Sequence, residues 1–427
     1  MIKKIIVIIT LFISVAGFAQ KNNASAYSFF GIGDKNNSNT VEQISMGGIG
    51  ASLNDEFRLN LSNPASLSSL KFTTYTLAIE NKNIWAKDSQ DEQQGASTYL
   101  SYLAMGIPLG ENAGMSFGLL PNTTVGYSLV ANSYNASQEL TEISAYNGEG
   151  GTNKVFLGVG LQIFKGFSFG LQGNYIFGKI ENNITNQLKD VSLATKYETL
   201  SRVKGFAINS GFQYKTKLSE KVNLHLGVNF DLESEMDTED EEYIYSLSIA
   251  SGEIPRDTLL SSEGKGILKF PLKTSLGIGF GKENKWFAGL DYSFQDALQL
   301  EGNIYNNFSK IAYDSYSKIS AGGFYTPKFT SITSYWERVT YRAGVKFEKT
   351  GLMVNSLGIG NDFTAIDDFG ISFGIGLPVS NQLSNLNLGF EFGKRGKIDK
   401  GLVQENYINF RLSFSLNDKW FKKREIF

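Results

Sequence analysis

The stretch QENYINFRLSFSLN, residues 404–417, decides the fold by its alternation. Every second residue from Ile408 to Leu416 is Ile, Phe or Leu, and the residues between them are Asn, Arg or Ser. Because successive side chains of a strand point to opposite sides, this segment has one apolar face and one polar face. The same pattern returns at 286–294, 369–377 and 386–392. We therefore expect an all-β protein built from long, two-faced strands.

The alternation recurs from residue 71 to the end of the chain and predicts about fourteen strands. We expect them near 71–81, 97–107, 113–129, 152–164, 166–181, 199–217, 221–234, 264–281, 285–299, 336–349, 351–361, 366–379, 384–394 and 404–417. Their connections are alternately tight turns, such as Lys165-Gly166 and Thr350-Gly351, and long loops. The long loops are expected at 130–151, 182–198, 235–263 and 300–335. Tight turns at one end and large loops at the other are typical of an antiparallel up-and-down barrel in the outer membrane.

Charge placement agrees with a barrel but does not by itself exclude a soluble fold. The four apolar faces described above contain no Lys, Arg, Asp or Glu. An Arg or Lys that faces lipid at the membrane midplane costs about 2–4 kcal/mol, which would enforce that absence. The core of a large secreted all-β protein would enforce it too, so this alternative stays open on the charge argument alone. The alternation of turns and loops favours the transmembrane barrel.

The first residues predict export from the cytoplasm. Lys3 and Lys4 precede an apolar run from Ile5 to about Val15, and Gly17-Phe18-Ala19 supplies small residues before Gln20. These are the three parts of a secretory signal peptide, and the run is shorter than the ~20 residues that a membrane-spanning helix needs. We divide the chain into a signal peptide at 1–19, an N-terminal segment at 20–70 and a transmembrane β-barrel at 71–427.

The composition argues against most enzymes and against nucleic-acid binding. The 427 residues include 40 Lys and Arg against 42 Asp and Glu, so no basic footprint is present. There is no cysteine and one histidine, His225, which excludes thiolate chemistry and centres with several histidines. We expect His225 to face the lumen and predict no catalytic residue, no enzymatic activity and no cofactor.

Residues 20–70 do not read as barrel strands, because Gly clusters and an Asn-Pro step interrupt them. The segment is still apolar enough to pack, and a barrel of fourteen strands would otherwise enclose water. We therefore expect it to form a hatch, or plug, inside the lumen.

Two motifs of this segment carry a resemblance to a known family. They are Met46-Gly47-Gly48-Ile49-Gly50-Ala51 and, just before the first strand, Asn63-Pro64-Ala65. Together with the Gly-rich hairpins 155–177 and 272–294, they resemble the FadL family of long-chain fatty acid transporters. The stretch 27–34 and the junction Ala19-Gln20 look more like members of that family from Bacteroidota.

The resemblance implies a fourteen-stranded barrel whose hatch gates the passive uptake of hydrophobic or amphipathic molecules. The residues that it assigns to the hatch and gate are Met46, Gly47, Gly48, Asn63, Pro64 and Ala65. In the family, a kink in the third strand opens the wall sideways. Pro121, beside Asn122 and near Gly126, interrupts the third strand here, because proline cannot donate to a β-ladder. A lateral opening is one interpretation, and a simple bulge or a strand that ends at Leu120 is the other.

Charges expected on lumen-facing positions are the remaining candidates. They are Asp291, Arg338, Arg342, Lys346, Glu391 and Arg411. Cross-strand ion pairs, such as one between Glu391 and Arg411, are one interpretation, and a cationic lumen that attracts a carboxylate-bearing cargo is the other.

The acidic run DLESEMDTEDEE, residues 231–242, is expected to enter an external loop. A solvated loop is the first interpretation. Calcium held by Glu235, Asp237, Glu239 and Asp240 is the second, because clustered carboxylates supply the oxygen ligands that Ca²⁺ takes.

Two functions of different classes are consistent with these patterns. The first is an outer-membrane barrel for passive uptake of hydrophobic or amphipathic, fatty-acid-like molecules, with a lateral exit. The second is a non-transporting accessory subunit of an outer-membrane protein secretion or assembly complex, with other outer-membrane proteins as partners. Both place the chain in the outer membrane, in contact with lipid, and neither involves nucleic acid.

Overall fold

The computed structural model describes residues 25–89, 91–248, 254–301, 311–355, 362–379 and 384–419. The predicted signal peptide lies outside them. A single antiparallel sheet closes on itself where β19 pairs with β2, from Asp418 against Thr73 to Gln404 against Lys87. No helix among the described residues is long and apolar enough to span a membrane.

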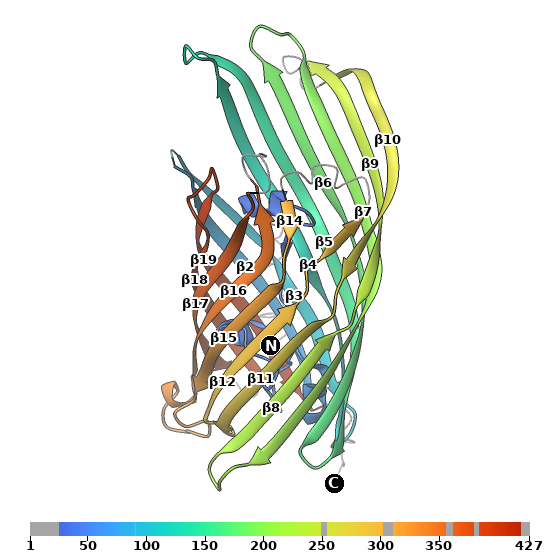
Figure 1. Cartoon of the computed structure of the whole chain (residues 1–427). Helices are drawn as coiled ribbons and strands as arrows, with labels where there is room; N and C mark the ends of the chain where they lie inside the picture. Colours follow the sequence, from blue (N-terminus) through green and yellow to red (C-terminus); the bar gives the residue numbers. More distant parts are fainter. Residues whose placement is uncertain are drawn as a thin grey trace, which may run out of the picture.

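The wall is made of eighteen strand segments, β2 to β19 (Figure 1). Their bounds are β2 Thr73–Lys87, β3 Glu92–Pro108, β4 Ala113–Tyr134, β5 Leu140–Phe164, β6 Phe167–Leu188, β7 Ala194–Lys217, β8 Asn223–Asp231, β9 Ser234–Ser248, β10 Ile254–Phe270, β11 Lys273–Lys282, β12 Trp286–Gln295, β13 Gln299–Glu301, β14 Ile311–Tyr313, β15 Tyr316–Tyr325, β16 Thr340–Val354, β17 Thr364–Val379, β18 Ser384–Gly396 and β19 Gln404–Asp418.

Four pairs of consecutive segments are each one strand with a short break. β7 pairs with both β8 and β9, and β9 and β8 pair in turn with β10 and β11. β12 with β13, and β14 with β15, continue each other in the same way against the neighbouring strands. The barrel therefore has fourteen strands, and the prediction of a fourteen-stranded antiparallel barrel is confirmed.

Two errors in the predicted strands cancel each other, so the predicted number of strands still equals the observed fourteen. The turn expected at Thr350-Gly351 is a bulge within the single strand β16, whose partner β17 shifts register between Lys349 and Met353. The region 311–325, expected as loop, forms the strand β14/β15. Polar and aromatic residues mix there without a clean period of two, so the pattern gave no strand signal.

The prediction of long loops on one side of the barrel is also wrong for most of them, because paired strands continue through these regions. β4 and β5 stay paired up to Tyr134 and Leu140, and β9 and β10 stay paired up to Ser248 and Ile254. Strands β4 to β7, β9 and β10 therefore rise above the rest of the wall as a one-sided sheet (Figure 1). The acidic run lies in β9 rather than in a loop.

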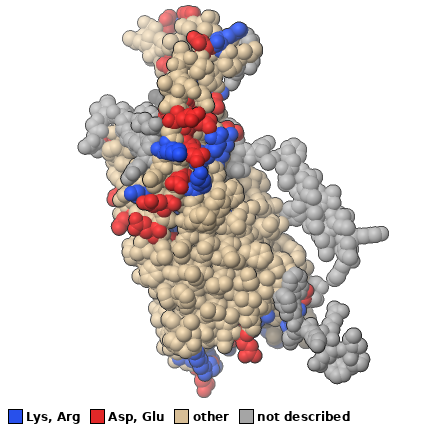
Figure 2. Space-filling view, turned by 90° about the vertical axis from the view of Figure 1, so that its right-hand side faces the viewer, with Lys and Arg blue, Asp and Glu red and all other residues tan. Residues whose placement is uncertain are grey.

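The outer surface has the banding expected of a membrane barrel. Large apolar side chains such as Leu157, Val159 and Phe206 are exposed on the outer face. Figure 2 shows a broad zone without Lys, Arg, Asp or Glu, bounded by charges above and below. Between β7 and β9, Lys204 pairs with Glu239 at 2.7 Å, and Arg202 pairs with Glu241. The barrel belongs in an outer membrane.

The N-terminal segment, residues 25–70, contains four short elements: η1 Ala26–Phe29, β1 Asp34–Lys35, α2 Val41–Ile44 and η2 Pro64–Ser69. A further short helix, η6 Trp336–Arg338, precedes β16 at the short-turn end. Most of the segment is buried against lumen-facing residues of the wall; Val41, Met46, Ile49 and Leu67, for example, are at most 2% exposed. Leu59, Leu61, Leu67 and Leu70 form one apolar cluster with residues of β2 to β5.

Candidate functional site

Asn63 and Asp291 attach the N-terminal segment to the wall. The Asn63 Nδ2 donates to the carbonyl of Ala51 at 2.7 Å and, at 3.3 and 3.4 Å, to carbonyls of the wall residues Val228 and Phe212. Its Oδ1 accepts the N–H of Ala65 at 3.0 Å and so caps η2. The Asp291 carboxylate accepts the N–H groups of Gly50 and Ala51 at 2.7 and 2.8 Å.

Wall glycines make room for this segment. A Cβ at Gly170 would lie 2.2 Å from the carbonyl carbon of Pro64, and one at Gly344 would lie 2.1 Å from that of Met46. No real Cβ approaches backbone so closely, so only glycine fits at either position. The Gly47 N–H donates to Ser372 Oγ at 2.9 Å, and Gly48 lies beside the Lys318 ammonium. The residues predicted for the hatch and gate therefore all lie where the segment meets the wall.

The wall is incompletely paired between β3 and β4. These strands share a ladder only from Leu103–Pro108 to Gly114–Leu119, although both continue well beyond it. Above Leu119, β4 pairs with β1, where Asp34 faces Thr124 and Lys35 faces Thr123.

The residues predicted for a lateral opening lie on this edge of β4. Pro121 is within the strand, and the pairing of β4 with β5 shifts between Pro121 and Thr123, so the interpretation that the strand ends at Leu120 is wrong. Asn122 accepts the Asn36 N–H on its carbonyl at 2.9 Å, and the Gly126 N–H donates to Ser28 Oγ at 3.2 Å.

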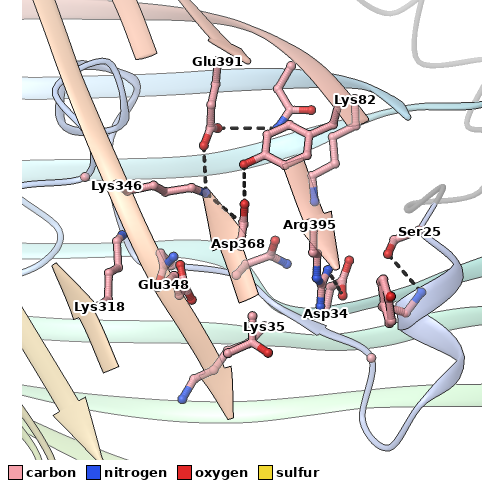
Figure 3. A pocket seen from close by; sticks show the side chains of 18 of the residues that line it. Ser25, Asp34, Lys35, Lys82, Lys318, Lys346, Glu348, Asp368, Glu391 and Arg395 are labelled. Carbon is pink, nitrogen blue, oxygen red and sulfur yellow. Dashed lines mark hydrogen bonds and ion pairs between the residues drawn. The ribbon is translucent and has the colours of Figure 1, made fainter. Parts of the chain in front are cut away.

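A cavity of about 220 Å³ lies between the N-terminal segment and the wall. On one side it reaches Tyr99 and Ser101 of β3 and Pro121 of β4, at the level where their ladder stops. Charged side chains line much of the rest (Figure 3). A second, smaller cavity of about 70 Å³ adjoins it and shares Lys273, Tyr316 and Lys318 with it.

An ion-pair network covers the cavity wall formed by β2 and β16 to β19. Arg411 pairs with Glu80 at 2.6 Å and with Glu391 at 2.7 Å. Lys346 pairs with the same Glu391 at 2.8 Å and with Asp368 at 3.3 Å (Figure 3). These side chains are at most 16% exposed, so each charge depends on its partners for compensation. Of the two interpretations of these lumen charges, ion pairing between strands therefore matches the observed geometry.

The other predicted lumen charges differ in their surroundings. Arg342 is buried and donates to Asn387 Oδ1 at 3.2 Å. Arg338 was expected on a lumen-facing strand, and this is wrong: it lies in η6, where its guanidinium stacks on Tyr335. β16 starts only at Thr340, so Arg338 belongs to the connection between β15 and β16.

Sequence reasoning missed the charges of the N-terminal segment and their partners. Arg395 pairs with Asp34 at 2.7 Å (Figure 3), and the Glu405 carboxylate accepts from Ser25 Oγ at 2.9 Å. Lys35, Lys273 and Lys318 also line the cavity. They come from three distant parts of the chain, and no local pattern of the sequence places any of them inward.

The proposed calcium ligands do not converge. Glu235 and Glu239 point outward from β9 and pair with Lys269 and Lys204, whereas Asp240 points inward and is 3% exposed. Asp237 alternates with the buried Met236 and Thr238 and lies on the outer face too. Across the described part of the chain, no group of three or more His, Asp or Glu could hold a metal ion.

His225 faces the lumen side and is buried. Its ring packs edge-on against Phe287, with centroids 5.5 Å apart. This contact with an aromatic side chain is that of a packed core residue.

The closed fourteen-stranded barrel, with an N-terminal segment docked on its lumen side, defines an outer-membrane barrel of the FadL and TodX type. The structure is similar to a FadL homologue of Pseudomonas aeruginosa, with a TM-score of 0.59, 11% identity, and coverage of 91% of this chain and 99% of that one. It is also similar to the toluene transporter TodX of Pseudomonas putida, with a TM-score of 0.60, 14% identity, and coverage of 90% and 98%.

The family model described as BamG matches residues 1–426, and the chain belongs to the BamG family. No curated protein sequence matches significantly. At 11% and 14% identity, the two barrels are evidence for the fold alone.

Proposed function

We propose that the protein is a passive outer-membrane channel for amphipathic small molecules, which leave its lumen sideways between β3 and β4. The observation that carries this proposal is the cavity that meets both strands where their ladder ends. An apolar tail that passed there would enter lipid without crossing a sealed sheet. Pro121, Asn122 and Gly126 would form one side of that opening.

The charged side chains of the cavity restrict the chemical class of molecule that the channel can carry. Hydrocarbon alone would have to displace water from Arg411, Lys346 and their carboxylate partners and would offer them no hydrogen bonds. A molecule with an apolar body and a charged head group can satisfy both the cavity and the membrane. This favours fatty-acid-like amphiphiles over simple hydrocarbons.

The N-terminal segment would act as the hatch in this proposal. Its attachments at Asn63, Pro64 and Ala65, and at Met46, Gly47 and Gly48, would hold it in the lumen, and β1 would cover the free edge of β4. We see no energy-coupling motif in the sequence, so we expect transport to follow the gradient, with no chemical conversion of the cargo.

Uptake in cells tests this function. The gene would be expressed in a Gram-negative host that lacks its own fatty-acid channel, and entry of radiolabelled oleate would be measured. We expect faster uptake than in the empty-vector host and saturation at high oleate. Equal uptake in the two strains, with the barrel folded in the outer membrane, would contradict the proposal.

The second candidate is an accessory subunit of an outer-membrane assembly complex. The BamG family name leaves such a role open, and the one-sided sheet of β4 to β7, β9 and β10 offers a surface beyond the membrane band (Figure 1). Gentle detergent extraction from the native membrane separates the candidates. A stoichiometric large partner would favour the subunit, and a monomer that carries lipid would favour the channel.

We also propose that the chain is one of the Bacteroidota-type members of the FadL-like barrels, because of the motifs in its N-terminal segment.

A further inference from the structure

The cavity has a second group of charged side chains, three lysines, beside the ion-pair network: β15, which carries Lys318, pairs directly with β16 of that network. Lys35 of β1, Lys273 of β11 and Lys318 of β15 all line the cavity, and Lys35 and Lys318 are visible in Figure 3. Lys154 of β5 lies nearby and donates to Ser38 Oγ at 2.5 Å. Three ammonium groups from three separate elements therefore line one space, and a fourth lies near it.

These lysines, like Lys82, which lies over the Tyr99 ring, lack the ion pairs that the cations of the network and Arg395 have. Among the described residues, no carboxylate oxygen lies within 4.0 Å of the ammonium of Lys35, Lys273 or Lys318, whereas Lys346, Arg395 and Arg411 are all paired. The Lys35 Nζ donates to Gln295 Oε1 at 3.2 Å, and the Lys273 Nζ lies 5.0 Å from the centre of the Tyr316 ring.

Lys318 is the most enclosed of the three. Its side chain is 8% exposed, and its ammonium lies so close to Gly48 that a Cβ there would be 2.9 Å from it. The neighbouring Glu348 carboxylate makes no direct ion pair with it, and a buried ammonium group without a contacting anion is costly, so an anion that reached Lys318 would gain free energy there.

The carboxylates around the lysines do not neutralise them by contact. Asp231 accepts a hydrogen bond from Asn209, and Asp291 is occupied by the N–H groups of Gly50 and Ala51. Glu348 lines the same cavity and stands beside Lys318 as its register partner on β16, with no oxygen within 4.0 Å of the ammonium (Figure 3). Four ammonium groups thus face three carboxylates, which leaves a positive excess.

Two buried polar atoms beside the lysines also have no partner. They are Ser320 Oγ, on the wall of the smaller cavity, and Asn36 Nδ2, on the wall of the larger one. A buried hydroxyl or amide without a hydrogen bond costs about 1–3 kcal/mol. Both can donate to an oxyanion. Desolvation inside the barrel and the neighbouring Lys273 ammonium lower the pKa of Lys35 to about 8, although its side chain is exposed to the lumen.

We propose that Lys35, Lys273 and Lys318 form a binding site for a phosphate group, carried by a lipid-like amphiphile or by a free phosphate ester. A phosphate monoester carries about −1.5 to −2 charges at pH 7 and three acceptor oxygens, so it can contact several ammonium groups at once. A monocarboxylate has one charge and two oxygens. The proposal refines the cargo of the proposed channel and rests on it only for passage through the wall, since binding can be measured without transport.

Binding is measured by calorimetry on the purified full-length barrel in an uncharged maltoside detergent. The probes are dodecyl phosphate, dodecanoate and inorganic phosphate. We expect dodecyl phosphate to bind more tightly than dodecanoate. Lys318→Gln and Lys273→Gln each remove one charge-assisted contact, so each variant should bind dodecyl phosphate about tenfold to a hundredfold more weakly. Lys318→Arg keeps the charge and should keep binding.

Lys179→Gln is the matched control, because Lys179 points outward from β6 and pairs with Glu181. It should bind as the unchanged protein does. Heat-dependent migration on gels verifies that each variant is folded. Inorganic phosphate that competes as well as dodecyl phosphate indicates a free phosphate ester, and phosphate that does not compete indicates a lipid head group.

Two results would overturn the site: equal binding of dodecyl phosphate by the folded Lys318→Gln, Lys273→Gln and control proteins, or tighter binding of dodecanoate. A result that contradicts the proposed transport function is a separate outcome. Lysine-dependent binding of dodecyl phosphate without any gain in oleate uptake would refute transport and leave the phosphate site intact.

Discussion

Replacing Asn63 with alanine should release the N-terminal segment from the wall. The side chain makes two short hydrogen bonds, to the Ala51 carbonyl at 2.7 Å and from the Ala65 N–H at 3.0 Å, and two longer ones to wall carbonyls at 3.3 and 3.4 Å. Asn63 is completely buried, so its loss leaves the Ala65 N–H without a partner in a dry environment. With about 0.5–1.5 kcal/mol for each hydrogen bond, and more for an orphaned donor, we expect a loss of about 2–4 kcal/mol.

A loss of this size shifts the balance between docked and undocked segments by a factor of about 30 to 1,000. The assay is limited proteolysis of the folded barrel, with cleavage within residues 25–70 followed by mass spectrometry, together with single-channel conductance in a planar bilayer. We expect faster cleavage and larger or more frequent openings for Asn63→Ala. Asn147→Ala is the control, because the Asn147 side chain accepts its hydrogen bond from the exposed Ser128 and not from the N-terminal segment. Identical cleavage and conductance for both variants would refute the argument that Asn63 fastens the segment.

Three further changes have defined outcomes. Gly344→Ala places a Cβ 2.1 Å from the Met46 backbone and should raise conductance, whereas Gly173→Ala, which meets nothing within 4 Å, should not. Leu157→Arg puts a charge on a side chain that is 56% exposed on the outer face, and urea unfolding in bilayers should show a loss of about 2–4 kcal/mol; no loss would contradict lipid contact. Lys35 has a pKa lowered to about 8 by desolvation inside the barrel beside another lysine, with two acidic groups partly opposing the effect, so affinity for dodecyl phosphate should fall between pH 7 and 9.5. Because the folded protein favours neutral Lys35, the unliganded barrel should gain stability over the same range, and Lys35→Gln should flatten both profiles.

The apolar faces of the strands could be predicted from the sequence because lipid excludes charged side chains from every second position of a strand. From Ile408 to Leu416 the period of two persists with no charge on the apolar face, and the structure pairs this stretch with β18 and β2 in register. Above the membrane that rule no longer applies. The sequence alone places the acidic run in a loop, because the partners of Glu239 and Glu241 lie 35 and 39 residues earlier in the chain, at Lys204 and Arg202 of β7.

The site was less predictable than the wall for a related reason. Glu391 and Arg411 could be paired from the sequence because their strands are neighbours. The lysine cluster could not, since β1, β11 and β15 meet only after the barrel has closed around the N-terminal segment. Nothing local distinguishes Lys35 or Lys273 from a surface lysine.

The lateral route between β3 and β4 is tested most directly by bridging the two strands. The chain has no cysteine, so Ser101→Cys with Pro121→Cys introduces one defined pair on the two sides of the unpaired edge, and a short thiol-reactive cross-linker with a reducible bond can join them. Oleate uptake would be measured before bridging, after it and after reduction. We expect uptake to stop when the strands are joined and to return on reduction. Undiminished uptake through a fully bridged wall would contradict the route.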